Sequence, residues 1–138
     1  MQNYIRSRVL HVWKALFMAR LLVIDDDLDL AKLTALRLTR AGHEVSSAHD
    51  GESGLAAIRS SHPELVVIDW MMPGMDGIEV CEAVRADSTI SETPLIMLTA
   101  KSSAEDYDRA YAAGINVVVS KPYTSSDLVG RINDLLAA

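Results

Sequence analysis

The chain has 138 residues, of which 49% are hydrophobic and 23% charged, a composition typical of one globular domain with a single core. Thirteen basic and nineteen acidic residues give a net charge of −6, and the four basic residues within positions 1–20 leave the rest strongly acidic, so we expect no nucleic-acid binding through charge. No apolar run of about 18 residues predicts a membrane span, and the single cysteine, Cys81, excludes an internal disulfide framework and fits a cytoplasmic location.

Residues 1–18 predict an amphipathic helix. Its apolar residues follow helical spacing, and they are Ile5, Val9, Val12, Trp13, Leu16 and Phe17. Such a helix could pack on the rest of the chain, pair with a second copy or lie on an anionic membrane. Because Trp13 and Phe17 would form an exposed apolar patch, we expect self-association, such as a homodimer through residues 1–18, or docking. Equally open is that the domain begins at Met18 and that residues 1–17 are not native to it.

From residue 20 onward, short apolar runs alternate with segments of helical periodicity. The predicted strands are 20–25, 43–48, 64–69, 94–100 and 116–121, and the predicted helices are 28–42, 51–61, 78–87, 103–114 and 125–138. Continuous Val, Ile and Leu strands between helices indicate an α/β domain with a parallel sheet covered on both faces. The first of these helices should place its leucines on one mostly apolar side: Leu30, Leu33, Leu36 and Leu38.

Polar residues gather where these strands end. Asp25, Asp26 and Asp27 follow the first strand, Asp69 the third, Thr99 the fourth and Lys121 the fifth. Each has an ordinary explanation alone, as a helix cap, a strand residue or a solvated charge. Ligands of open parallel sheets bind at the carboxyl ends of the strands, so together these residues predict one site.

The run of acids in "LLVIDDD" is costly without a counter-charge. Two carboxylates about 4 Å apart repel by about 4 kcal/mol at an effective dielectric near 20. A divalent cation would offset that repulsion, and Mg²⁺ needs only one or two carboxylates besides water. Acids, a hydroxyl and an amine around Mg²⁺ could support formation of an acyl phosphate on a carboxylate.

Four motifs make this pattern specific: "LLVIDDD", "VVIDWMMPGMDG", "PLIMLTA" and "VVVSKPY". In this order and spacing the chain resembles the receiver domain of two-component response regulators over about residues 19–138. The resemblance implies a doubly wound, five-stranded, flavodoxin-like (βα)5 fold with strand order 2-1-3-4-5. It also implies a phosphorelay function, in which a histidine kinase or phosphotransfer protein donates a phosphoryl group to Asp69.

Further site residues follow from the resemblance alone. Mg²⁺, or Mn²⁺ as a substitute, would be held by Asp25, Asp26, Asp69 and the backbone carbonyl of Met71. Thr99 and Lys121 would contact the phosphoryl group, Ala100 would leave room for it, and the bond before Pro122 would be cis. The resemblance implies a bacterial stand-alone receiver that is no enzyme, although self-phosphorylation from small donors and autodephosphorylation are expected. Its downstream target would bind the face formed by the fourth helix, fifth strand and fifth helix.

The chain departs from the family pattern at Val118, where the family often has an aromatic residue that couples to the threonine. Tyr107 and Tyr123 remain nearby candidates for reporting the change. Asp27 and Asp29 are better explained as acids at the entrance of the first helix than as metal ligands.

Three alternatives stay open. A phosphatase of the haloacid dehalogenase class would use Asp25 as nucleophile within Asp-x-Asp, but Asp29 stands where that motif has Thr or Val and the chain is short for the class. A flavodoxin-like nucleotide or flavin binder would need a glycine-rich loop after the first strand, which is absent here. A receiver-like module could also bind partners without phosphorylation, although the complete set of Asp69, Thr99 and Lys121 argues against it.

Overall fold

The computed structural model describes residues 18–138. The amphipathic helix predicted for residues 1–18, and the homodimer predicted through it, fall on residues 1–17, outside the described part of the chain. Among the described residues, no helix is both long enough and apolar enough to cross a membrane.

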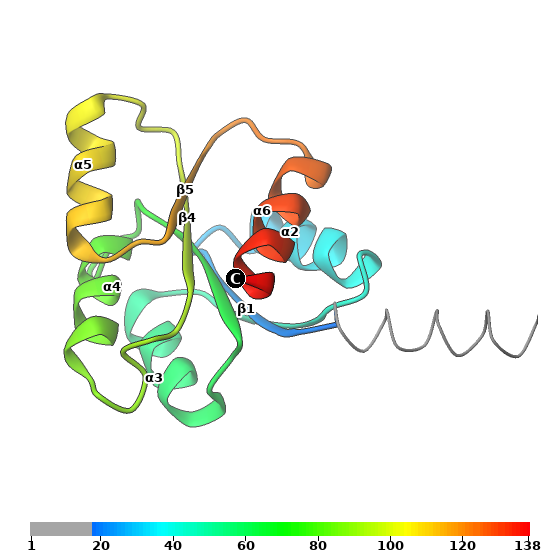
Figure 1. The fold of residues 1–138 in the computed structure, drawn as a ribbon, viewed down its shortest axis with the longest axis horizontal. Helices are drawn as coiled ribbons and strands as arrows, with labels where there is room; N and C mark the ends of the chain where they lie inside the picture. The colour runs from blue at the N-terminus through cyan, green and yellow to red at the C-terminus, as the bar shows by residue number, and fades with distance from the viewer. Residues whose placement is uncertain (1–17) are drawn as a thin grey trace, which may run out of the picture.

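Within residues 18–138 the chain forms five strands that alternate with five helices (Figure 1). The strands are β1 (Arg20–Ile24), β2 (Glu44–Ala48), β3 (Leu65–Asp69), β4 (Leu95–Thr99) and β5 (Val117–Ser120). The helices are α2 (Leu28–Arg40), α3 (Gly51–Ser61), α4 (Gly77–Ala86), α5 (Ala104–Ala113) and α6 (Ser125–Ala137). These bounds confirm the predicted elements, with ends that differ by at most two residues.

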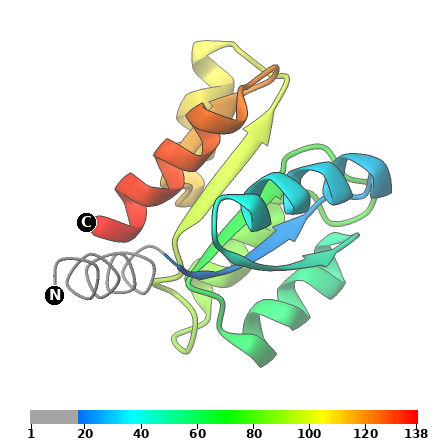
Figure 2. The same ribbon diagram turned by 90° about the vertical axis from the view of Figure 1, so that its right-hand side faces the viewer.

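All strand pairs are parallel, and the order in the sheet is β2-β1-β3-β4-β5 (Figure 2). The predicted flavodoxin-like order is therefore confirmed. The inner strands β3 and β4 are buried along their whole length, whereas β2 lies at the edge and is mostly exposed. This difference explains why residues 44–48 gave the weakest strand signal in the sequence.

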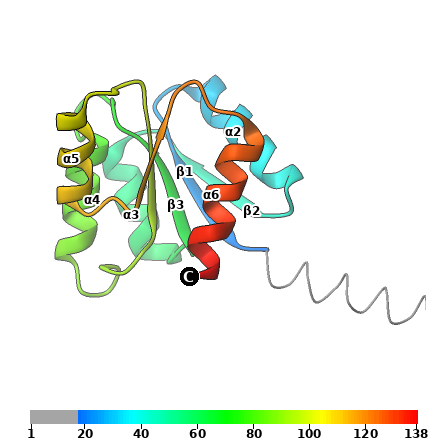
Figure 3. The same ribbon diagram turned by 45° about the horizontal axis from the view of Figure 1, so that its top comes forward.

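Two helical layers cover the sheet (Figure 3). Helices α2 and α6 lie on one face, where Leu38, Leu128 and Ile132 pack against strand residues such as Val23 and Val67. Helices α3, α4 and α5 lie on the other face, over a larger core. Because all the strands are parallel, they end at the same edge of this three-layer domain, and this brings the polar residues that follow them together.

The apolar side predicted for α2 is wrong for three of its four leucines. Leu38 is buried, but Leu30, Leu33 and Leu36 are 45%, 41% and 46% exposed. With about 3.6 residues per turn, Ala31, Thr34 and Leu38 share one stripe, and that stripe faces the sheet. The hydroxyl of Thr34 shares a hydrogen bond of 3.2 Å with the Tyr123 hydroxyl, so this polar residue can be buried there.

Side chains at the N-termini of all five described helices accept backbone hydrogen bonds. These capping residues are Asp27, Asp50, Asp76, Ser103 and Thr124. Such caps satisfy backbone N–H groups that have no partner inside the helix. Because each of these helices follows a strand of the parallel sheet, all five caps lie at the edge where the strands end.

Candidate metal and phosphoryl site

The strand register brings the predicted site residues to one edge of the sheet. Asp69 is the last residue of β3 and pairs with Leu98, and Thr99 is the last residue of β4 and pairs with Ser120. Asp25 comes directly after β1 and Lys121 directly after β5. Residues separated by almost one hundred positions therefore lie in a single site.

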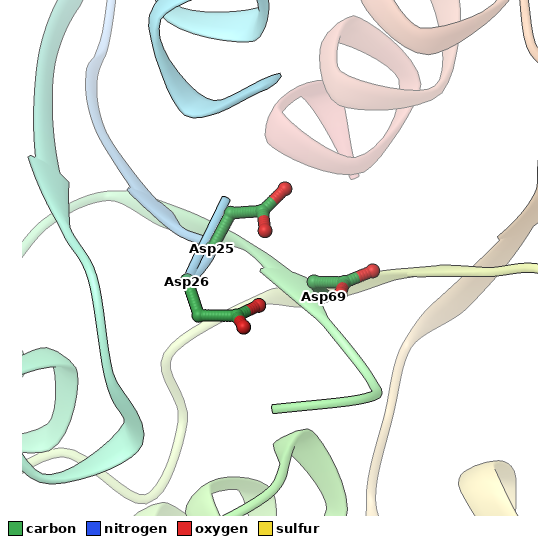
Figure 4. Close-up of side chains that lie close together, drawn as sticks. All are labelled: Asp25, Asp26 and Asp69. Atoms are coloured by element: carbon green, nitrogen blue, oxygen red, sulfur yellow. The ribbon is translucent and has the colours of Figure 1, made fainter. Parts of the chain in front are cut away.

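Three carboxylates meet at this edge: those of Asp25, Asp26 and Asp69 (Figure 4). Their nearest ligand oxygens all lie within 4.8 Å of one another. Asp25 and Asp69 are buried, whereas Asp26 is exposed. Carboxylate oxygens at this spacing, with one open side, fit the coordination preferences of Mg²⁺, which binds one or two carboxylates and keeps several waters.

The electrostatics of Asp25 agree with a cation site. Burial raises the pKa of its carboxyl above the usual 3.8, and the charges of Asp69 and Asp26 add to this effect. The Asp27 backbone N–H, which donates to Asp25 Oδ1 at 3.0 Å, and the charge of Lys121 act in the opposite direction. The ionised form of Asp25 is thus disfavoured on balance, and a cation bound beside it would reverse that preference.

Lys121 supplies the positive charge of the site. Its Nζ donates a hydrogen bond of 2.7 Å to Asp69 Oδ1. Burial alone would lower the pKa of Lys121, but the hydrogen bond and charge of Asp69, together with Asp25, outweigh burial and raise it. Lys121 therefore remains protonated at neutral pH. Its backbone N–H donates to the Thr99 carbonyl at 2.8 Å, and the Lys121–Pro122 bond is cis, in agreement with the expectation.

Thr99 is fully buried beside Asp69, and its Oγ1 accepts the backbone N–H of Lys101 at 2.9 Å. Ala100, the next residue, is exposed at the rim. The side chain of Met71 is 62% exposed, two residues after Asp69. That the Met71 carbonyl binds a metal and that Ala100 makes room for a phosphoryl group both stay predictions.

Asp27 has a different task from its two neighbours. Its Oδ1 accepts the backbone N–H groups of Asp29 and Leu30, each at 3.1 Å, and so caps α2. The prediction that Asp27 and Asp29 serve the entrance of this helix is confirmed. Because the Asp27 carboxylate is occupied by the helix, the structure does not support an Asp-x-Asp pair of the phosphatase type at Asp25 and Asp27.

Two residues of this edge were not singled out from the sequence. Gly77 lies against the site so closely that a Cβ atom would come within 2.6 Å of the Asp69 carbonyl oxygen. Trp70 follows Asp69, and its ring is approached by the cations of Lys101, at 5.0 Å from the ring centroid, and Arg109, at 5.9 Å. In the sequence, only the position of Trp70 directly after Asp69 pointed to the site. Its approach by Lys101 and Arg109, which lie 31 and 39 residues further along the chain, could not be seen there.

Comparison with known proteins agrees with this geometry. A model of the response regulator receiver domain family matches residues 21–133. Over 113 residues, 82% of this chain, the sequence is 39% identical to the DNA-binding response regulator MtrA of Mycolicibacterium paratuberculosis, of which the match covers 49%. Over 117 residues, 85% of this chain, it is 39% identical to the probable transcriptional regulator ycf27 of Cyanophora paradoxa, of which the match covers 48%. The chain thus spans about half the length of these curated relatives.

A solved structure shows the same fold. The chemotaxis protein CheY4 of Vibrio cholerae superposes with a TM-score of 0.80 at 32% sequence identity. The match covers 85% of this chain and 98% of the CheY4 chain. The similarity therefore extends over almost the whole CheY4 chain.

Proposed function

The chain belongs to the receiver domain family of two-component response regulators, and on that premise we propose that it accepts a phosphoryl group on Asp69. Receiver domains are phosphoacceptor signalling modules rather than enzymes that turn over a separate substrate. The observation that carries the choice of Asp69 is its place between the other two acids and Lys121. Among the described residues, no other carboxylate both belongs to the cluster with Asp25 and Asp26 and lies 2.7 Å from a lysine ammonium group.

In the proposed reaction an oxygen of the Asp69 carboxylate attacks the phosphorus of the donor. The new P–O bond makes an acyl phosphate, while the bond from phosphorus to the donor nitrogen of a phosphohistidine, or to the acetate oxygen of acetyl phosphate, breaks. The donor leaves with the electron pair of that bond, as imidazole or as acetate. Lys121, already on Asp69 Oδ1, would pair with the transferred group, and the Thr99 hydroxyl would donate to one of its oxygens.

Asp25, Asp26 and Asp69, with the Met71 carbonyl, would hold a Mg²⁺ ion, or Mn²⁺ in its place. When bound, this ion would neutralise charge on the phosphoryl group during transfer. Self-phosphorylation from small donors and autodephosphorylation belong to the same proposal.

We further propose that the new charge on Asp69 shifts the population of the loop that follows β4, residues 100–103, and of the adjoining face of α5, β5 and α6. A histidine kinase or phosphotransfer protein would be the donor, and a downstream protein would read that face. The strongly acidic residues beyond position 20 argue against nucleic-acid binding by this domain itself. A cytoplasmic location stays a prediction.

The proposal is tested by incubating the protein with acetyl phosphate and Mg²⁺ and mapping the adduct by mass spectrometry. Asp69→Ala should abolish the label, whereas Asp108→Ala, a matched change of an exposed acid on α5, should leave it intact. Label that persists after Asp69→Ala would contradict the assignment. Label mapped to Asp25 would instead favour the phosphatase-type alternative.

A further inference from the structure

The ring of Trp70 connects three segments around the proposed acceptor. Trp70 follows Asp69 directly and is only 1% exposed. Lys101, whose Nζ lies 5.0 Å from the ring centroid, belongs to the loop after β4, and Arg109, whose Cζ lies 5.9 Å away, belongs to α5. Both distances are within the range of about 6 Å over which a cation is attracted to an aromatic ring.

Lys101 also connects this ring to Thr99. Its backbone N–H donates to Thr99 Oγ1 at 2.9 Å, while its ammonium group lies 3.9 Å from Asp106 Oδ1 at the start of α5. Lys101 is therefore held through its backbone by the Thr99 hydroxyl and through its side chain by Trp70 and Asp106. A change at Thr99 releases one of these attachments and leaves the loop dependent on the others.

The fifth strand cannot supply an aromatic coupling residue in the usual place. Val118 is buried there, and its backbone N–H donates to the Tyr111 hydroxyl at 3.2 Å. Trp70 offers a large aromatic ring that follows Asp69 and is approached by cations of the loop and of α5. Its position therefore suits the role of the aromatic coupling residue, which Val118 lacks the ring to fill.

We propose that Trp70 is a positioning residue that couples Asp69 to residues 100–103 and to α5 through Lys101 and Arg109. This inference rests on the proposed phosphorylation of Asp69. A phosphoryl group there adds negative charge on the residue before Trp70, whose ring attracts both cations, and it draws the Thr99 hydroxyl away from the Lys101 N–H. The cations are then held less by the ring, and the loop and α5 move relative to Trp70.

The test measures amide hydrogen exchange over residues 100–113 in the full chain, before and after labelling with acetyl phosphate and Mg²⁺. The variants are Trp70→Leu, which removes the aromatic ring, and Trp70→Phe, which keeps a weaker one. A double variant, Lys101→Met with Arg109→Met, removes the cations but keeps the buried tryptophan and so avoids damage to the core. Arg131→Met, an exposed change on α6, is the control.

In the wild-type protein and in Arg131→Met, labelling should change exchange over residues 100–113. The change should fall about twofold or more in Trp70→Leu and in the double variant at equal labelling, and Trp70→Phe should be intermediate. A full response in both Trp70→Leu and the double variant would overturn the inference alone. Absence of label on wild-type Asp69, read from the mass of the same samples, would instead overturn the proposed function on which it rests.

Discussion

Replacing Asp26 with asparagine should stabilise the protein in the absence of divalent ions and remove its response to Mg²⁺. Asparagine has nearly the shape of aspartate but no charge, so the change tests electrostatics with little effect on packing. Asp26 is the exposed member of the acidic trio, and the substitution therefore leaves no buried polar group without a partner.

The size of the effect follows from the spacing of the trio. At 4.8 Å, the largest separation of the chosen ligand oxygens, two unit charges repel by about 0.9 kcal/mol in water and by about 3.5 kcal/mol at an effective dielectric of 20. Because Asp26 is exposed, the lower figure applies to each of its two pairs, and Lys121 reduces the contribution of Asp69. A gain of about 1 kcal/mol remains, which corresponds to a melting temperature about 4 °C higher for a domain of this size.

Mg²⁺ should stabilise the wild-type protein much more than Asp26→Asn. At a concentration one hundred times its dissociation constant, an ion that binds only the folded protein adds about 2.7 kcal/mol to the unfolding free energy. The wild-type protein should show such an increase, and Asp26→Asn should lose most of it because one of the ligands is gone.

The assay is thermal unfolding followed by circular dichroism, with EDTA and with a series of Mg²⁺ concentrations. Asp27→Asn is the matched control, because it removes a charge from the adjacent acid while asparagine still caps α2. It should keep the full Mg²⁺ response. An equal Mg²⁺ shift in wild type and Asp26→Asn, or a lower stability of Asp26→Asn in EDTA, would refute the reasoning about the acidic trio.

Three further outcomes are expected. Gly77→Ala should lower the unfolding free energy by about 1–3 kcal/mol in urea titrations, because its Cβ would press on the Asp69 carbonyl oxygen at 2.6 Å; unchanged stability would contradict the close packing. Burial raises the pKa of the Cys81 thiol to about 11, so a thiol reagent at about pH 8 should modify Cys81 only after unfolding, and rapid labelling of the folded protein would contradict this. Burial lowers the pKa of His43 below 6.5, so below that pH the unfolded chain binds more protons than the folded protein, and the unfolding free energy should fall as the pH drops through about 6.5. His43→Gln should make the unfolding free energy depend less on pH in this range, as measured by unfolding titrations at several pH values. An unchanged pH dependence would exclude His43 as its cause.

Most of the fold could be predicted from the sequence because its signals are local. Every strand except β2 is a short apolar run, and each helix begins at a capping Asp, Ser or Thr, so most elements are visible without knowledge of their partners. The strand order was not local information, and it came from the resemblance. The leucines of α2 show where the local pattern failed. Leucine spacing predicted an apolar side, but the helix packs through the smaller Ala31 and Thr34, whose burial depends on the sheet below and on Tyr123.

The composition of the site could likewise be predicted, but not its contacts. Parallel topology brings every strand end to the same edge, which is enough to gather Asp25, Asp69, Thr99 and Lys121. Which carboxylate accepts the hydrogen bond from the Lys121 ammonium group depends on side-chain conformations. These are determined by the packing of residues far apart in the sequence, here Asp69 and Lys121, which are 52 positions apart. The cations around Trp70 could not be predicted for the same reason.

The charges of the site explain why three consecutive aspartates are tolerated. Asp27 is used by the helix, and the trio of Asp25, Asp26 and Asp69 is partly balanced by Lys121. Three carboxylates and one ammonium leave two negative charges, which one divalent ion would balance. A phosphoryl group on Asp69 brings further negative charge that this arrangement does not offset. This added charge attracts other cations, and the two cations that approach Trp70, the residue after Asp69, lie on the loop and helix that are expected to move.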